Sequence, residues 1–297
     1  MCSLVYISFI KSKVEIMSIK VKIGLAQLLV EGGEPDRNIE RAISMIEEGA
    51  EKQCDIILLP ETMDFAWTHP SSIEDALPIP GAYSDIFCAQ AAKYKVWICV
   101  GLTEKKGDKN YNTALLINRE GEIVLKYHKI NLLNVEFPFY EIGNTLNVVD
   151  TEFGKVGVNI CADNYHDSLN IGHTLARMGA QFILSPSSWT VDYSITEEDD
   201  PYEEKWLKPY KVLSSYYNMV IVGTTCVGYI VGGPYEGKKS IGCSLVVGPA
   251  GMMGQGKFNE FAGELVVAEF EVPERKEKGT EIGQMLKSRG IVFEQPI

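Results

Sequence analysis

The sequence is poor in histidine, in closely spaced cysteine pairs and in positive charge, and each shortage excludes a class of protein. Its four histidines include no His-x-x-x-His pair, so a histidine metal cage is not expected. The seven cysteines contain no Cys-x-x-Cys pair, and we expect reduced thiols in a cytoplasmic protein. Forty acidic residues against 28 basic ones give a formal charge of −12, which disfavours a nucleic-acid partner.

Long apolar runs and flexible linkers are also missing. The longest uncharged stretch, residues 219–234, is too short and too rich in glycine to span a bilayer, so no membrane association is expected. Residues 1–16 have an apolar centre without a basic residue before it or a cleavage site after it. We interpret them as an N-terminal extension that is non-native or disordered. The catalytic domain is predicted to occupy residues 17–272, and the charged tail 273–297 is either disordered or an arm that contacts a second subunit.

Strand-like and helix-like segments alternate along the chain, which predicts one α/β domain with two sheets and helices outside them. Apolar residues at helical spacing follow Asp36, which we place at the helix N-cap, and Pro209 predicts a kink or a late start in the last helix. The strands are expected at 19–27, 55–60, 96–102, 113–118, 122–128, 156–160, 181–185, 219–225, 244–247 and 265–270, and the helices at about 39–50, 82–94, 167–178 and 202–217.

Three reactive side chains follow predicted strands directly. Glu61 follows IILLP, Lys129 follows a strand that ends KYH, and Cys161 follows VGVNI. Ligand sites in mainly parallel sheets lie beyond the carboxyl ends of the strands. A carboxylate, an ammonium and a thiol that meet there could transfer an acyl group. Taken singly, each residue also fits a structural role: a packed thiol, a capping acid and a solvated lysine.

The local motifs resemble those of the nitrilase, or carbon–nitrogen hydrolase, superfamily. LLPETMD, KYHKINLL and VGVNICADN occur in the family's order, within a resemblance that runs from about Val21 to Val272. A second family glutamate precedes a glycine by seven residues, which matches Glu136 and Gly143 better than the nearby Glu141. The resemblance implies a four-layer α-β-β-α sandwich that assembles as a homodimer or larger oligomer.

The resemblance also implies a role for each residue. Glu61 would be the general base and later the acid, and Cys161 the nucleophile that forms a thioester. Lys129 and the backbone amide of Ala162 would bind the oxyanion, and Glu136 would orient Lys129 or the substrate. No metal or organic cofactor is implied, and the expected substrate is a small amide or N-carbamoyl compound.

The substrate is less well defined by the sequence. EFPFYEIGNT and TEFGKVGVNIC are most similar to N-carbamoyl amino acid amidohydrolases and β-ureidopropionases, but those relatives carry an arginine shortly after the cysteine. Here Asp163 and Asn164 occupy those candidate substrate-binding positions, so a substrate carboxylate lacks its usual partner. Trp189 is either a pocket wall or a core residue. The seven acids between 192 and 204 form either a solvated loop or a rim that favours a cationic amide.

Several alternatives remain open at this point. A nitrilase could use the same residues, although nitrilases usually continue the nucleophile as Cys-Trp-Glu. An acyltransferase could resolve the thioester with an amine, and a small-molecule sensor could retain the fold without catalysis. A papain-like pairing of Cys161 with His166 is disfavoured, because such dyads are built from residues far apart in sequence.

Overall fold

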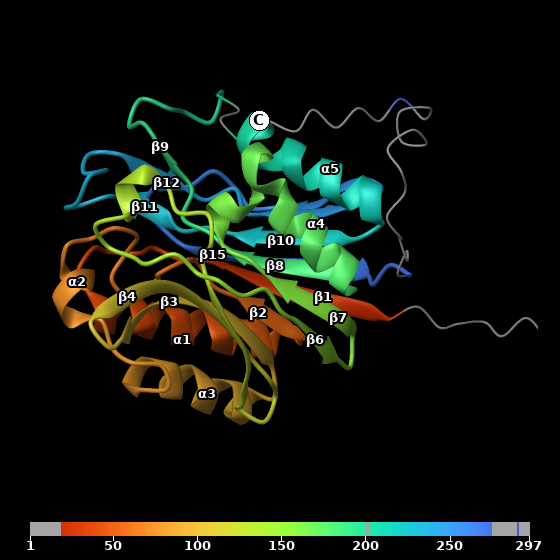
Figure 1. Ribbon diagram of the computed structural model, residues 1–297, viewed down its shortest axis with the longest axis horizontal. Coiled ribbons are helices and arrows are strands. Elements are labelled where there is room, and N and C mark those ends of the chain that lie inside the picture. The colour runs from red at the N-terminus through yellow and green to blue at the C-terminus, as the bar shows by residue number, and fades with distance from the viewer. Residues whose placement is uncertain (1–18, 200–201, 275–289, 291–297) are drawn as a thin grey trace, which may run out of the picture.

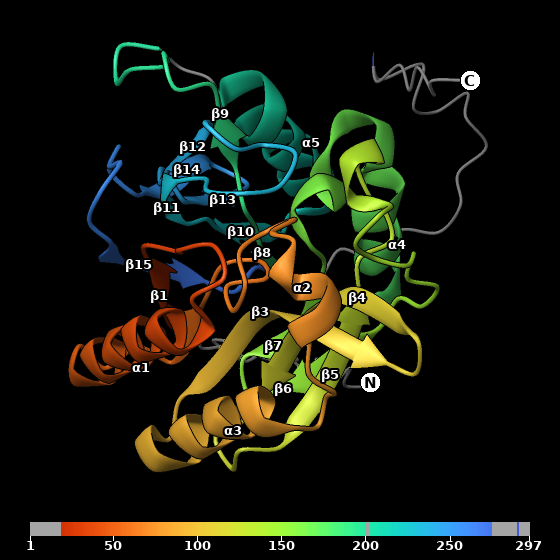
Figure 2. The same ribbon diagram turned by 90° about the vertical axis from the view of Figure 1, so that its left-hand side faces the viewer.

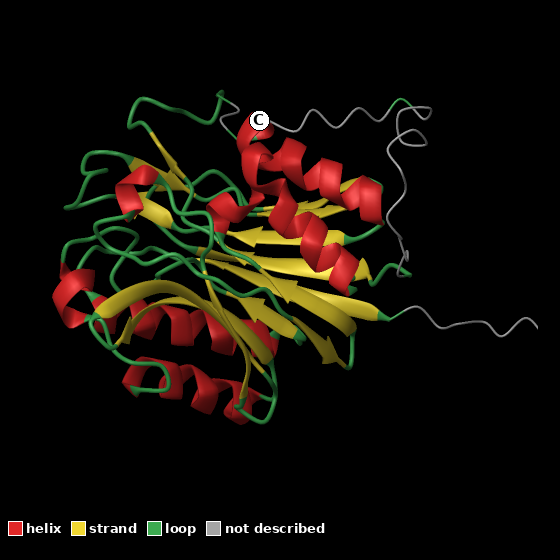
Figure 3. Ribbon diagram, viewed as in Figure 1, coloured by secondary structure: helices red, strands yellow, loops and turns green. Residues whose placement is uncertain are grey.

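The computed structural model describes residues 19–199, 202–274 and 290, which form four layers (Figure 1). Two six-stranded sheets lie face to face, and helices cover both outer faces (Figure 3). The helices α1 (Pro35–Glu51) and α3 (Ala82–Tyr94) cover the first sheet, and α4 (Leu169–Met178) and α5 (Lys208–Tyr217) cover the second. The predicted α-β-β-α sandwich is confirmed. The proposed extension at 1–16 and nearly all of the tail 273–297 lie outside the described residues.

The first sheet has the strand order β15-β1-β2-β3-β4-β5. Its parallel centre, β1-β2-β3, is flanked by antiparallel partners on both sides. The strands are β1 (Lys20–Gln27), β2 (Ile56–Leu58), β3 (Trp97–Lys106), β4 (Lys109–Ile117), β5 (Ile123–His128) and β15 (Glu264–Glu271). Because two antiparallel pairings separate β5 from β3, β5 again runs parallel to β2, and both strands end at the same edge.

The second sheet repeats this plan in the order β14-β13-β10-β8-β7-β6, with β7, β8 and β10 parallel at its centre. Its strands are β6 (Val148–Thr151), β7 (Gly154–Val158), β8 (Phe182–Pro186), β10 (Val220–Thr224), β13 (Leu245–Gly248) and β14 (Gly251–Gln255). A small third sheet contains β9 (Thr190–Val191), β11 (Val227–Tyr229) and β12 (Lys239–Ile241). The short helix α2 (Ser71–Asp75) lies near the exposed end of β4 (Figure 2).

The two faces of each sheet contribute to different cores because side chains alternate along a strand. In β2, Ile56 and Leu58 belong to the core between the sheets, whereas Ile57 packs with Ile39 of α1 and Phe87 of α3. All five side chains are at most 4% exposed. Burial on both faces explains why the central strands read as continuous apolar runs in the sequence.

The starts of two helices can be compared with the sequence prediction: the first differs from it, and the last agrees with it. The first helix begins at Pro35, so the N-cap position falls on Glu34, and Asp36 lies inside the first turn. Proline is favoured at this position because its nitrogen has no hydrogen to leave unpaired, and Asp36 still interacts favourably with the helix dipole. The last helix starts late, as Pro209 predicted: α5 begins at Lys208 after a π-helical turn over Glu203–Leu207.

Candidate active site

The structure brings three of the predicted residues into one buried, hydrogen-bonded cluster at the shared edge of the first sheet. Glu61 follows β2, Lys129 follows β5, and Glu136 ends a short 3₁₀ turn, Asn134–Glu136. The Lys129 Nζ lies 2.8 Å from the Glu61 Oε1 and 2.9 Å from both carboxylate oxygens of Glu136. None of the three side chains is more than 1% exposed. A buried ammonium loses its hydrating water, and the two carboxylates compensate for this loss by forming ion pairs with it.

The charges in this cluster determine its protonation states. Burial alone would lower the pKa of Lys129, but the negative charges of Glu136 and Glu61 raise it well above its ordinary value. Lys129 is therefore an ammonium at neutral pH. Burial raises the pKa of Glu61 by more than Lys129 lowers it. Glu61 is thus more basic than an ordinary carboxylate, which suits a group that must accept and return a proton.

Cys161 lies beside this cluster at the carboxyl end of β7 and is a free, buried thiol. Burial, followed by the charge of Glu61, raises the pKa of this thiol, while Lys129 and the backbone N–H of Ser188 act in the opposite direction. A thiol with a raised pKa needs a base before it can act as a nucleophile. The Glu61 Oε2 is buried and has no hydrogen-bond partner among the described residues, so one oxygen of this carboxylate is free.

The backbone around Cys161 is strained, with a φ of +45° that non-glycine residues rarely adopt. Asp163 holds this turn in place. Its Oδ2 accepts the N–H of Ile160 and the hydroxyl of Tyr127, and its Oδ1 accepts the N–H of Asn131. Tyr127 and Asn131 flank Lys129, so one carboxylate joins the turn around Cys161 to the segment that carries the ammonium. We call this set of contacts the Asp163 clasp.

Two residues of the cluster were missed by sequence reasoning. Asn112 on β4 donates to the Glu61 Oε1 at 2.7 Å and to the Glu136 Oε1 at 3.3 Å. Trp67 donates its indole N–H to the Glu136 Oε1 at 2.8 Å. Both donors fix the carboxylates without changing their charge. Asn112 lies in the polar first half of its strand, KNYNTALLI, before the apolar run that marks the strand in the sequence, so no pattern singled it out.

Comparison with known proteins places these residues in a family. The model of the carbon-nitrogen hydrolase family matches residues 22–277. The chain belongs to the carbon–nitrogen hydrolase family. Its relatives include a nitrilase of Pyrococcus abyssi, 33% identical over 59% of this chain and 67% of that protein. An omega-amidase of Saccharomyces cerevisiae is 31% identical over 59% of this chain and 66% of that protein. The matched region thus spans about two thirds of these relatives' length.

Solved structures agree with this fold. A carbon-nitrogen hydrolase from Helicobacter pylori G27 superimposes with a TM-score of 0.72 at 21% identity, over 86% of this chain and 90% of that one. An amidase from Nesterenkonia sp. AN1, in a structure with acrylamide added at its active-site cysteine, gives a TM-score of 0.71 at 20% identity, over 85% and 94% of the two chains. The predicted superfamily and its hydrolase class are confirmed, whereas the predicted N-carbamoyl branch stays a prediction.

The family's glutamate-to-glycine spacing has a structural reason in this chain. Gly143 lies against the strand end that carries the ammonium, and its N–H donates to the carbonyl of Lys129 at 2.8 Å. A Cβ at Gly143 would lie 2.0 Å from the carbonyl oxygen of His128. The segment after Glu136 must therefore return to the same strand end, and only glycine fits where it arrives.

The remaining predicted site residues are buried and bonded within the protein. Asn164 exchanges hydrogen bonds with Asn159 and also donates to Ser185, so its amide is engaged in the scaffold. Ala162 is fully buried, and its carbonyl accepts the side-chain amide of Asn131. These contacts, like those of Asp163, hold the turn around Cys161. Substrate contact by Ala162, Asp163 and Asn164 stays a prediction.

Trp189 lies in the core beneath the second sheet's helices rather than at an open surface. It is 1% exposed and stacks on Trp206 with ring centroids 4.6 Å apart. Tyr202 and Tyr210 pack against its edges. This surrounding favours the core-packing alternative for Trp189.

The acidic loop is solvated over its described part. Glu197, Glu198 and Asp199 are exposed, and Asp192 pairs with Lys238 at 2.7 Å. Asp200 lies outside the described residues. Across residues 19–199 and 202–274, no group of three or more histidine, cysteine, aspartate or glutamate side chains could hold a metal ion. No helix in that same part is both long and apolar enough to cross a bilayer.

Proposed function

We propose that this protein hydrolyses the C–N bond of a small, non-peptide amide through a thioester on Cys161. The observation that carries the proposal is the free Oε2 of the buried Glu61 beside a free thiol and an ammonium. A buried carboxylate oxygen without a partner is costly, and it is retained here next to the one group whose proton a hydrolase of this kind must move. Several omega-amidases among the relatives support an amide as the substrate.

The first half of the reaction forms the thioester. Glu61 accepts the thiol proton as the sulfur of Cys161 attacks the carbonyl carbon of the amide. Lys129 and the backbone N–H of Ala162 stabilise the negative charge that develops on the carbonyl oxygen. The tetrahedral intermediate then collapses: the C–N bond breaks, and Glu61 returns the proton to the leaving nitrogen, which departs as ammonia or an amine.

The second half releases the acid. Water takes the place of the leaving group, Glu61 accepts a proton from it, and the resulting nucleophile attacks the thioester carbonyl. The C–S bond breaks, the carboxylic acid leaves, and the thiol of Cys161 is restored with the proton from Glu61. Glu136 and Asn112 act as positioning residues, since they hold Lys129 and Glu61 in the geometry that both halves require.

Ammonia release tests the proposal directly. The wild-type protein and Cys161→Ala would be incubated with aliphatic amides, omega-amides, N-carbamoyl amino acids, carbamoyl polyamines and nitriles. Release from an amide by the wild type, absent in Cys161→Ala, supports the proposal. Cys88→Ala, which removes a half-buried thiol on α3, is the matched control and should remain active. Release only from nitriles, or equal release by Cys161→Ala, would overturn it.

A further inference from the structure

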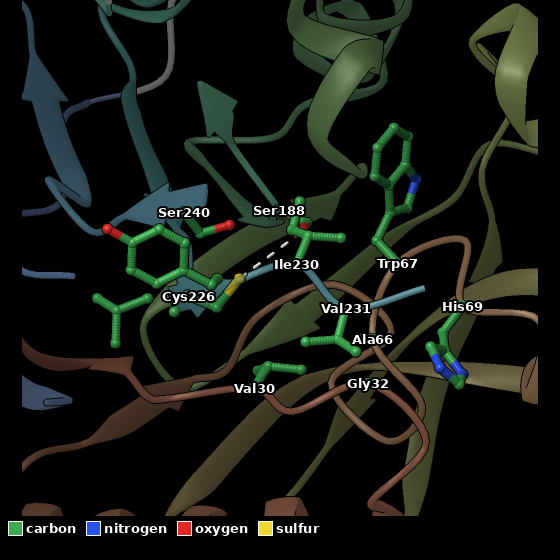
Figure 4. A pocket seen from close by; sticks show the side chains of 13 residues that line it. Val30, Gly32, Ala66, Trp67, His69, Ser188, Cys226, Ile230, Val231 and Ser240 are labelled. Carbon is green, nitrogen blue, oxygen red and sulfur yellow. Dashed lines mark hydrogen bonds between the residues drawn. The ribbon is translucent and has the colours of Figure 1, made fainter. Parts of the chain in front are cut away.

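A pocket is lined by two residues that contact the catalytic cluster, and Figure 4 shows the side chains that line it. Trp67 forms part of its wall, and the indole N–H of the same residue donates to Glu136. Ser188 forms another part, and its backbone N–H contacts the sulfur of Cys161. A group bound in this pocket is therefore one residue away from both the nucleophile and the acidic cluster. This position suits the part of the substrate that does not react.

The pocket wall is neutral and mainly apolar. Val30, Ala66, Cys226, Ile230 and Val231 contribute side chains to it. None of the described lining residues is an aspartate, glutamate, lysine or arginine. His69 also lines the pocket, and burial lowers the pKa of its imidazole, so the ring is neutral at neutral pH.

Two lysines directly precede the lining residue Ser240 in the sequence, and both already form ion pairs. Lys239 on β12 is 3% exposed and forms an ion pair with Glu260. Lys238 pairs with Asp192 at 2.7 Å. Neither ammonium is left free to bind a substrate carboxylate.

The catalytic cluster itself also disfavours an anion. It contains one ammonium, on Lys129, and two carboxylates, on Glu61 and Glu136. With both carboxylates ionised, its net charge is one negative unit, and the protein as a whole carries −12. A second carboxylate on the substrate would lose its hydration next to this charge and gain no counter-ion.

We infer that the pocket binds the uncharged, apolar part of the substrate, and that the enzyme acts on neutral aliphatic amides in preference to amides that carry a carboxylate. This inference rests on the proposed amidase function and narrows its substrate class. It also distinguishes this protein from an enzyme whose substrate must carry a carboxylate in addition to the amide. Since a methylene buried in an apolar pocket strengthens binding, kcat/KM should rise about fourfold for a methylene that enters it.

Matched pairs of amides provide the first test. Butyramide and succinamate differ only in a terminal methyl against a carboxylate, and so do pentanamide and glutaramate. We expect kcat/KM to be at least about tenfold higher for the neutral member of each pair, because the pocket offers no partner for the charge. Equal values, or a preference for succinamate and glutaramate, would overturn the inference while the amidase function stands.

A single substitution at the rim provides the second test. Val231 lines the pocket and is 62% exposed, so a longer side chain can be placed there without disturbing the core. Val231→Lys should raise kcat/KM for succinamate about tenfold over the value for Val231→Gln, because it supplies the missing cation. Val231→Gln, similar in length but neutral, is the control. If both variants treat succinamate alike, the inference fails.

Binding to Cys161→Ala separates this inference from the proposed function. Ligand-observed NMR on that variant compares butyramide with succinamate without any turnover. Tighter binding of butyramide supports the inference even if the wild type releases no ammonia, a result that would overturn only the proposed function. Tighter binding of succinamate overturns the inference whatever the wild type hydrolyses.

Discussion

Glutamine should have different effects at the two glutamates that contact Lys129. Glu136→Gln should mainly lower the stability of the fold, whereas Glu61→Gln should mainly lower the activity. Glu136 accepts five hydrogen bonds: two from Lys129 and one each from Trp67, Asn112 and the N–H of Leu133. Glu61 accepts two, both on Oε1, and leaves Oε2 free among the described residues. Glutamate-to-glutamine removes one charge and converts one acceptor oxygen into a donor in each case.

The expected losses in the free energy of unfolding follow from the different hydrogen bonds of the two glutamates. In Glu136→Gln, the new amide group faces Lys129 and the N–H of Leu133, so one buried ion pair is broken and one buried donor loses its acceptor. We expect a loss of about 3–5 kcal/mol in the free energy of unfolding. In Glu61→Gln, one ion pair with Lys129 is also lost, but the amide can be oriented to keep its oxygen on Lys129 and Asn112, so no donor loses its acceptor. The loss of stability should then be only about 1–2 kcal/mol.

The loss of activity should be larger for Glu61→Gln than for Glu136→Gln. Glu61→Gln removes the proton acceptor, and we expect kcat to fall by a factor of at least about 10³ in a protein that still folds. Urea unfolding followed by tryptophan fluorescence measures the stabilities, and ammonia release measures kcat. Glu61→Asp, which keeps the carboxylate, serves as a control for charge. If Glu61→Gln keeps wild-type activity, or Glu136→Gln keeps wild-type stability, the assigned roles are wrong.

Three further predictions concern the scaffold and the surface. Asp163→Asn should lower kcat more than it raises KM in steady-state assays, because it weakens the Asp163 clasp without touching the pocket; a pure KM effect would contradict this. Burial raises the pKa of Asp64 from 3.8 to about 7, so the folded protein holds this proton more tightly than the unfolded chain. The resulting contribution to the free energy of unfolding is fully present below pH 3.8 and is lost as pH rises through about 7. Asp64→Asn should flatten the pH dependence of urea unfolding over that window, and an unchanged slope would refute it. Glu197→Lys combined with Glu198→Lys should leave KM for a cationic amide unchanged, since both residues are exposed; a marked rise would restore the acidic-rim hypothesis.

The positions of Glu61, Lys129 and Cys161 could be predicted because each follows a strand that the sequence indicates. A strand buried on both faces has a mostly apolar composition. Glu61 follows IILLP, Lys129 follows a strand that ends KYH and Cys161 follows VGVNI, and the structure places these strand ends close together. Glu136 was assigned from the family's seven-residue spacing to Gly143, although the cause of that spacing, the contact with the backbone of His128, could not be predicted.

The supporting contacts could not be predicted, because they depend on segments without a regular period. Trp67 lies in a loop where Thr62, Ala66 and Thr68 all have positive φ, a conformation that no sequence pattern specifies for these residue types. The direction of its indole is set by that loop. The position of Asp163 two residues after Cys161 predicts a substrate contact, but the bonds that its carboxylate accepts from Tyr127 and Ile160 could not be predicted.

The Asp163 clasp also has a consequence for how the chain can vary in length. The clasp closes a loop that runs from Asn131 to Asp163. The two ends are joined by a hydrogen bond of 2.8 Å from the N–H of Asn131 to the Oδ1 of Asp163. Asn144 and Thr145, inside that loop, are exposed and follow the anchored Gly143. Residues inserted between them would enlarge a loop that is already closed, at an entropic cost of only about 0.6 kcal/mol for a doubling of its length. This stretch is therefore a place where the protein can gain sequence while its ammonium and thiol keep their separation.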